Sequence, residues 1–176
     1  MRLKLAALAT TGVLALAGCA SGNPQVAAYV DGTPISESQV DGPAEALANA
    51  SSDATDSASA FSATVLSIII QSKVAAAAAA TDPSIAVTQA QRDTEIAGNE
   101  TLATLVKDPA ATDFINDYVE ASLIVSSDAG KAAFTKQFAQ TSVKLNPRFG
   151  TWDATQFAIA DGSNGSLSSV APIKQE

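Results

Sequence analysis

The sequence predicts a mainly helical domain that is closed by a small antiparallel pairing of an N-terminal and a C-terminal strand. Residues 61–80 carry apolar side chains at helical spacing, which predicts one long helix. Residues 26–31 and 143–153 are the two convincing extended stretches, because both contain β-branched and aromatic residues next to turn signals. A short strand has unpaired backbone groups at both edges, so we expect these two stretches to pair with each other.

Residues 1–18 have the pattern of a bacterial lipoprotein signal peptide. Arg2 and Lys4 form a positive n-region, and residues 5–16 form an apolar h-region that is too short to span a bilayer. The sequence LAGC at residues 16–19 matches a lipobox, in which small residues admit the signal peptidase and the thiol takes up a diacylglyceryl group. We therefore predict removal of residues 1–18 and lipid attachment at Cys19.

The remaining chain is predicted to form one domain that is anchored outside the cytoplasm to the bacterial cell membrane. Residues 19–25 form a lipidated tether, residues 26–160 the folded domain and residues 161–176 a flexible tail. Cys19 is the only cysteine, so no disulfide stabilises the domain. The net charge of −8 becomes more negative when the basic signal peptide is removed, which argues against a nucleic-acid partner.

Turn and cap signals place the first helical segment. Asp31-Gly32 predicts a turn after the first strand, and Ser36 with Gln39 forms a capping box that starts a helix at the next residue. Gly42-Pro43 is expected to interrupt this helix, with a second short piece over residues 44–50.

The long helix over residues 61–80 has two interpretations. Its length also suits a membrane span, but Lys73 lies in its middle, where a lysine in a bilayer costs about 2.5–3.5 kcal/mol. A core helix is therefore favoured, preceded by a mobile Ser/Ala/Asp-rich connector over residues 51–60. Its predicted core face contains Phe61, Val65, Leu66, Ile68, Ile69, Ile70, Ser72 and Ala76.

Further helices are predicted in the second half of the chain. Thr88 with Gln91 forms a second capping box for a helix that continues to about Leu105, and Asp108-Pro109 provides the cap of the next helix. The next helix has a predicted apolar face of Phe114, Ile115, Tyr118, Val119, Ser122 and Val125. A last helix starts at Ser127 or Asp128 and carries Ala129, Ala133, Phe134, Phe138 and Ala139 on its apolar face.

The chain changes from helical to extended periodicity after the last helix. Val143–Leu145 alternate apolar and polar residues, Asn146-Pro147 marks a bend, and residues 149–153 are extended again. Phe157 and Ile159 predict one more short extended piece before the tail.

The two strand regions resemble a known family of extracytoplasmic chaperones. VAAYVDGTPIS, at residues 26–36, resembles the VAxVNGxxIT opening of SurA- and PrsA-type chaperones. VKLNPRFGTWD, at residues 143–153, resembles the closing V-x-x-NPRYG-x-W segment of lipoproteins with a SurA-like N-terminal domain. IAVTQAQR, at residues 85–92, is similar to the entry of a later helix in the same family. The resemblance implies a SurA-like helical chaperone domain that binds unfolded exported polypeptides.

The chain departs from this family in two respects. Gly42-Pro43 falls inside the usual first helix, and residues 99–108 are too short to contain the parvulin-type prolyl isomerase domain that many relatives insert. Parvulin active sites use histidine, and this chain has none. Isomerase activity is therefore not expected here.

The residue types argue against an enzyme. Without histidine or a thiol beyond Cys19, the usual catalytic triads and His/Cys metal sites are excluded, and no nucleotide-binding motif or other cofactor site is predicted. Asp113, Asp117 and Glu120 share one helical stripe, which is open to interpretation as an acid pair, a weak cation site or, as we favour, a solvated face.

The closing segment contains the candidate peptide-binding or structural residues Arg148, Phe149 and Trp152. Arg148 suits bidentate recognition of a carboxylate, or an internal ion pair, which we favour. Trp152 suits an exposed ligand anchor, or core packing, which we favour.

Two functions from different classes remain open. One is an ATP-independent, chaperone-like lipoprotein whose apolar groove binds unfolded exported polypeptides. The other is a non-catalytic cell-envelope module with one fixed protein partner, because a fold does not determine a function.

Overall fold

The computed structural model describes residues 23–51 and 57–160, which form a mainly helical fold with small antiparallel sheets. The predicted signal peptide, the predicted lipid-attachment residue Cys19, the first part of the predicted tether, the middle of the predicted connector and the predicted tail lie outside these residues. The helices are α1 (Glu37–Ala50), α2 (Ala58–Thr81), α3 (Gln89–Gly98), α4 (Glu100–Leu105), α5 (Thr112–Ser126) and α6 (Asp128–Phe138). The strands are β1 (Val26–Val30), β2 (Thr33–Ser36), β3 (Val143–Leu145), β4 (Thr151–Asp153) and β5 (Ala158–Ala160).

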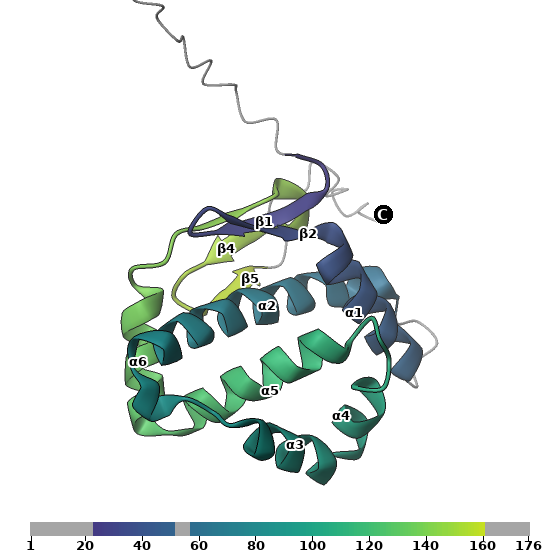
Figure 1. The fold of residues 1–176 in the computed structure, drawn as a ribbon. Helices are drawn as coiled ribbons and strands as arrows, with labels where there is room; N and C mark the ends of the chain where they lie inside the picture. Colours follow the sequence, from purple (N-terminus) through teal and green to yellow (C-terminus); the bar gives the residue numbers. More distant parts are fainter. Residues whose placement is uncertain (1–22, 52–56, 161–176) are drawn as a thin grey trace, which may run out of the picture.

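Helix α2 lies at the centre of the fold, with the strands on one side and α5 on the other (Figure 1). It contacts α1, α5, α6 and β5, and half of its most apolar stretch is buried inside the protein, although its length and composition would also suit a membrane span. This packing agrees with the predicted core helix. The helix begins at Ala58, three residues before the predicted start, and Ala76 of the predicted core face is exposed.

The predicted pairing of the two chain ends is confirmed for β1 and β3. Ala28, Tyr29 and Val30 lie opposite Leu145, Lys144 and Val143 in an antiparallel ladder. Backbone and side-chain hydrogen bonds from Ser142 and Asn146 extend the pairing at both ends of β3.

The prediction that residues 149–153 continue this pairing is wrong. They form β4, which pairs with β5 in a separate two-stranded sheet. The chain changes direction between β3 and β4 because Pro147–Phe149 form a 3₁₀ turn and Gly150 follows with a φ of 108°, which a glycine adopts readily. The predicted extended piece around Ile159 is β5.

Strand β2 was not predicted from the sequence. Asp31 and Gly32 have φ values of 49° and 80°, which identifies a tight two-residue hairpin that pairs β2 with β1. Pro34 is tolerated in β2 because this strand is at the edge of the sheet, where a missing N–H breaks no ladder on its outer side.

Helix α1 runs without interruption, so the predicted break at Gly42-Pro43 is wrong. Its capping box at Ser36 and Gln39 is present as predicted. An internal proline disfavours a helix, but Val40, Pro43 and Ala44 are all buried against the core. Packing of this apolar face stabilises the helix across the proline.

Two of the later helices have different bounds from those predicted, and the differences occur next to the polar residues Asn99 and Asp108. The capping box of Thr88 and Gln91 starts α3 as predicted, but Asn99 caps a separate helix α4, with its side chain accepting a hydrogen bond from Leu102 N at 3.2 Å. Asp108-Pro109 forms a turn, and α5 begins only at Thr112. Helix α6 starts at Asp128, within the predicted choice. Four residues of the predicted apolar faces are exposed: Tyr118, Ser122, Ala129 and Ala139.

Candidate functional site

The candidate site is a hollow of about 470 Å³ between α2, α5 and α6, which we call the α2–α5–α6 groove. Tyr118 on α5 is on the rim of this groove, and its side chain is 38% exposed. In residues 23–51 and 57–160, it is the one large hydrophobic side chain that is exposed to solvent. A hollow with an exposed aromatic side chain on its rim suits the binding of apolar side chains. Its apolar lining is Ile68, Tyr118, Ala121, Val125, Phe134 and Phe157. Its polar lining is Gln71, Ser72, Ser122, Lys131, Thr135 and Gln156.

A second hollow of about 570 Å³ adjoins the groove, and we call it the α6–β4 hollow. Thr135 and Phe157 line both hollows, so the two are neighbours with a shared wall. The α6–β4 hollow is further lined by Phe138, Ala139, Thr141, Ser142, Val143, Trp152 and Ala154.

Four aromatic side chains form the packing that supports both hollows. The Phe138 ring lies 4.4 Å from the Phe157 ring and 5.8 Å from the rings of Phe134 and Trp152, measured between centroids. The Phe134 and Phe157 rings meet edge to face at 5.5 Å. Such edge-to-face and offset contacts are favourable arrangements of aromatic rings, so these residues hold the shared wall in place.

Phe157 has a backbone conformation that bulky residues rarely adopt. Its φ is 54°, in the left-handed region. Gln71 Nε2 on α2 donates a hydrogen bond of 2.7 Å to its carbonyl oxygen, and the rings of Phe134 and Phe138 contact its side chain. The surrounding structure thus fixes a strained residue at the wall between the two hollows, and such strain is common at functional sites.

Arg148 forms an ion pair with Glu37, the first residue of α1. The favoured internal ion pair is therefore confirmed, and it ties the closing segment to the start of the first helix. The guanidinium also lies 5.0 Å from the centre of the Phe149 ring, a cation–π contact. Phe149 itself is partly buried against the core.

Trp152 packs into the core, as favoured from the sequence. It is partly buried, contacts both clusters of core residues and stacks on Phe138 with an interplanar angle of 26°. It also lines the α6–β4 hollow, and it is the one of the three candidate residues that lines either hollow. Tyr118, Ser72 and Phe157 of the groove wall were not identified as site residues, because helical spacing placed the first two on core faces.

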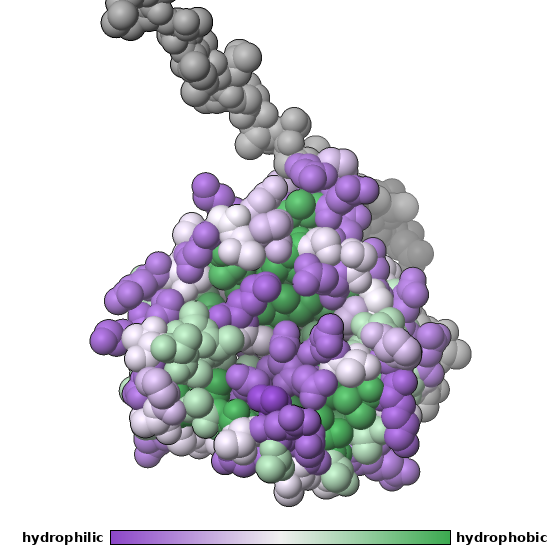
Figure 2. All heavy atoms as spheres, in the orientation of Figure 1, coloured by the Kyte–Doolittle hydropathy of each residue, from purple (hydrophilic) through white to green (hydrophobic). Residues whose placement is uncertain are grey.

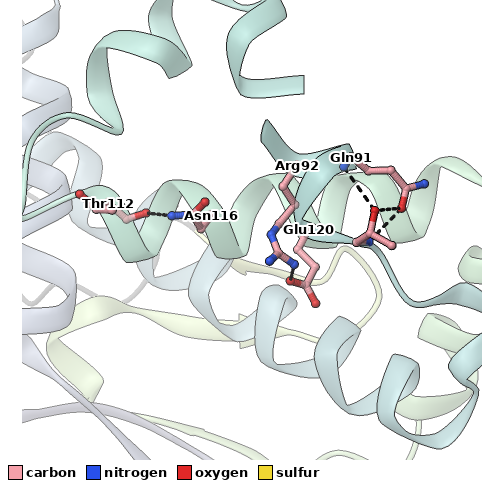
Figure 3. A network of polar contacts seen from close by, with 6 residues as sticks. Gln91, Arg92, Thr112, Asn116 and Glu120 are labelled. Carbon is pink, nitrogen blue, oxygen red and sulfur yellow. Dashed lines mark hydrogen bonds and ion pairs between the residues drawn. The ribbon is translucent and has the colours of Figure 1, made fainter. Parts of the chain in front are cut away.

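The acidic stripe of α5 is only partly a solvated face. Asp113 and Asp117 are exposed, but Glu120 accepts a hydrogen bond of 2.6 Å from Arg92 on α3 (Figure 3). Within the described residues, no group of three His, Cys, Asp or Glu side chains could hold a metal ion. The structure therefore gives the cation-site alternative no support.

Replacing Asp117 by asparagine should raise the stability of the domain at neutral pH. Although the Asp117 side chain is exposed to solvent, neighbouring protein atoms partly desolvate its carboxylate, and this desolvation, followed by the charge of Glu120, raises its pKa above the ordinary value. A carboxyl group whose pKa is higher in the folded than in the unfolded state stabilises the folded state at low pH. This stabilisation is lost as the pH rises through the folded-state pKa. We expect Asp117→Asn to increase the free energy of unfolding at pH 7 but not at pH 3, measured by urea denaturation.

The control for this prediction is Asp41→Asn, which removes the same charge from an exposed position of α1. If both variants increased the free energy of unfolding equally at pH 7, the effect would come from the net charge of the protein and not from the environment of Asp117.

Comparison of the whole chain with protein-family models, curated proteins and solved structures found no match. The resemblance to SurA-type chaperones remains a prediction from the two end segments.

Proposed function

We propose that this protein is a membrane-anchored extracytoplasmic lipoprotein with ATP-independent, chaperone-like binding of unfolded exported polypeptides. The observation that carries the proposal is the α2–α5–α6 groove, which combines an apolar lining, an exposed tyrosine on its rim and a second aromatic hollow beside it. The predicted lipid at Cys19 would keep the domain at the membrane, where exported chains emerge unfolded.

The proposed mechanism is reversible burial of client side chains. Apolar surface gains about 25 cal/mol per Å² when it is removed from water, so a few side chains in the groove are held weakly. The client then dissociates and folds elsewhere without a step that needs ATP or a catalytic residue. Half of the lining residues are polar, but most of the exposed surface of the groove is apolar and Lys131 is its one charged residue, so apolar contacts dominate its chemistry.

The test is suppression of aggregation of an unfolded client protein, followed by light scattering. We expect the domain at molar excess to suppress most of the scattering and Tyr118→Glu to lose most of this effect, since a charge on the rim opposes burial of apolar side chains. Ala76→Glu is the matched control, because Ala76 is exposed on α2 and is not part of the groove lining. Equal protection by the wild type and Tyr118→Glu would contradict the proposal.

A second function, a cell-envelope module with one fixed protein partner, is favoured by the limited exposed apolar surface. Tyr118 is the single large hydrophobic side chain classed as exposed in the described part of the chain, and hydrophobic areas on the face in Figure 2 are separated by hydrophilic residues. Cross-linking in cells separates the two functions. One stoichiometric partner would support the fixed module, and many clients would support the chaperone.

A further inference from the structure

The three-stranded sheet has one blocked edge and one open edge. Its strand order is β2-β1-β3, so β2 and β3 are the two outer strands. Pro34 lies on β2 and has no N–H to offer a further strand, which blocks that edge. Strand β3 contains no proline, and within residues 23–51 and 57–160 it pairs with no strand other than β1. Its outer edge is therefore open to a further strand.

The backbone of Val143 and Leu145 faces this open edge. Ser142 O accepts a hydrogen bond of 2.9 Å from Asp31 N, so Ser142 faces the β1 side of the ladder. Hydrogen-bonded positions alternate along an antiparallel ladder, so Lys144 faces β1 as well. Val143 and Leu145, at the alternate positions, direct their N–H and C=O groups away from β1. Both residues are partly exposed, and each offers one donor and one acceptor to a partner.

The core side of this edge adjoins the α6–β4 hollow. Val143 and Leu145 lie opposite the buried residues Val30 and Ala28, so their side chains are on the core face of the sheet. Val143 also lines the α6–β4 hollow, which has a volume of about 570 Å³. The side chain of Lys144 is on the opposite face and is exposed. A strand added here would direct every second side chain to the side of the hollow.

We propose that an extended segment of the client adds to the outer edge of β3 as an antiparallel strand, with alternate apolar side chains in the α6–β4 hollow. Client residues opposite Val143 and Leu145 exchange backbone hydrogen bonds with them, and their side chains share the face of the hollow. The client residue between them lies opposite Lys144, a position that favours an acidic side chain. This inference rests on the proposed function and specifies how the domain recognises the backbone of its client.

A second copy of this chain fits the edge less well than a client segment. Two β3 strands that paired about a twofold axis would place Lys144 of one copy opposite or diagonally across from Lys144 of the other. Like charges at such positions are destabilising, and a lysine on an edge strand protects against self-pairing. Because β3 has three residues, a client segment forms few hydrogen bonds and is held weakly, as the proposed mechanism requires.

Calorimetry of the wild-type protein with the capped peptide Val-Ser-Val-Glu-Val-Ser-Val tests this pairing. N-methylation of the two inner valines removes the N–H groups that would face β3, with the glutamate opposite Lys144. N-methylation of the two serines is the matched control, since it removes N–H groups that would face away from β3. We expect the valine-methylated peptide to bind at least about tenfold more weakly and the serine-methylated peptide to change by less than about threefold.

A charge exchange at Lys144 tests the register of the added strand. Lys144→Glu should weaken binding of this peptide by about two- to fivefold and should strengthen binding of a peptide with lysine in place of its glutamate by a similar factor. Lys136→Glu is the matched control, because Lys136 is exposed on α6 and lines neither hollow. We expect it to change the affinity for either peptide by less than about twofold.

The outcomes separate this inference from the proposed function. Equal loss of affinity for the two methylated peptides, or no binding of the unmodified peptide, would overturn the inference, while suppression of aggregation by the wild type would still support the proposed function. A dimer of the wild type that the peptide dissociates would assign the edge to a second copy and would also overturn the inference. If the wild type neither binds the peptide nor suppresses aggregation, both fail together.

Discussion

Replacing Phe138 by alanine should lower the free energy of unfolding by about 3–5 kcal/mol, the range found for phenylalanine in protein cores. Phe138 is buried and contacts the rings of Phe134, Trp152 and Phe157. Its removal leaves a cavity beneath the strained Phe157 and removes three aromatic contacts. Urea denaturation measures the change, with the emission of the single tryptophan as the signal.

Phe138→Leu is the matched control, since it keeps most of the buried volume and removes only the ring contacts. We expect Phe138→Leu to lower the free energy of unfolding clearly less than Phe138→Ala does. A loss below about 1 kcal/mol for Phe138→Ala would show that the aromatic cluster does not support the fold in the way described here. The same variant should also weaken client binding, because Phe138 lines the α6–β4 hollow.

Replacing Gly130 by alanine should destabilise the domain by about 3 kcal/mol or more, although helix propensity alone predicts a gain of about 1 kcal/mol. A Cβ atom at Gly130 would lie 1.8 Å from the backbone oxygen of Ile124, so the chain must shift. Gly130 N also donates the 3.0 Å hydrogen bond to Ser127 Oγ that caps α6, and the shift would break this cap. Thermal and urea denaturation both measure the loss.

Gly98→Ala is the control for the effect of helix propensity alone. Gly98 is the last residue of α3, and a Cβ atom there would have no atom within 4 Å. We expect this substitution to be neutral or to stabilise by up to about 1 kcal/mol. If Gly130→Ala behaved in the same way, α5 and α6 could not approach as closely as the structure shows.

The features that could be predicted from the sequence depend on local chemistry. The capping boxes at Ser36 and Thr88 involve side chains three residues apart, so their pattern identifies the start of a helix without knowledge of the fold. Residues 143–145 could be assigned as the partner of the first strand because few other stretches have strand character. The apolar spacing of residues 61–80 predicted the long helix, and Lys73 in its middle favoured a core helix over a membrane span.

The features that could not be predicted depend on tertiary contacts. Gly42-Pro43 has a strong local tendency to end a helix, but the burial of Pro43 and its neighbours outweighs it. Asp31-Gly32 predicted the turn of the β1–β2 hairpin, but Pro34 argues against a strand unless that strand is known to lie at the edge of a sheet, as β2 does. The separate pairing of β4 with β5 depends on the turn at Pro147–Phe149 and on Gly150, whose effect on chain direction is not visible in a pattern of strand residues.

The candidate site was harder to predict than the fold. Arg148 and Trp152 were identified with the correct structural roles, but the groove combines the consecutive helices α5 and α6 with α2 and the segment before β5, which are distant from each other in sequence. Tyr118 follows the apolar spacing of α5, and only the packing of α2 and α6 shows that it is on an exposed rim. The hydroxyl of Ser72 is buried without a hydrogen-bond partner among the described residues, and this has no sequence signal, since Ser67 is equally buried on the same helix and is fully bonded.

Site-specific photo-cross-linking of the full-length protein tests the proposed client site most directly. A photoreactive phenylalanine analogue is placed at position 118 on the groove rim or, as a control, at position 76 on the exposed face of α2. With an unfolded exported polypeptide present, we predict cross-links from position 118 that are lost when the client is folded, and none from position 76. Equal cross-linking from both positions, or no cross-linking from position 118, would contradict client binding in the α2–α5–α6 groove.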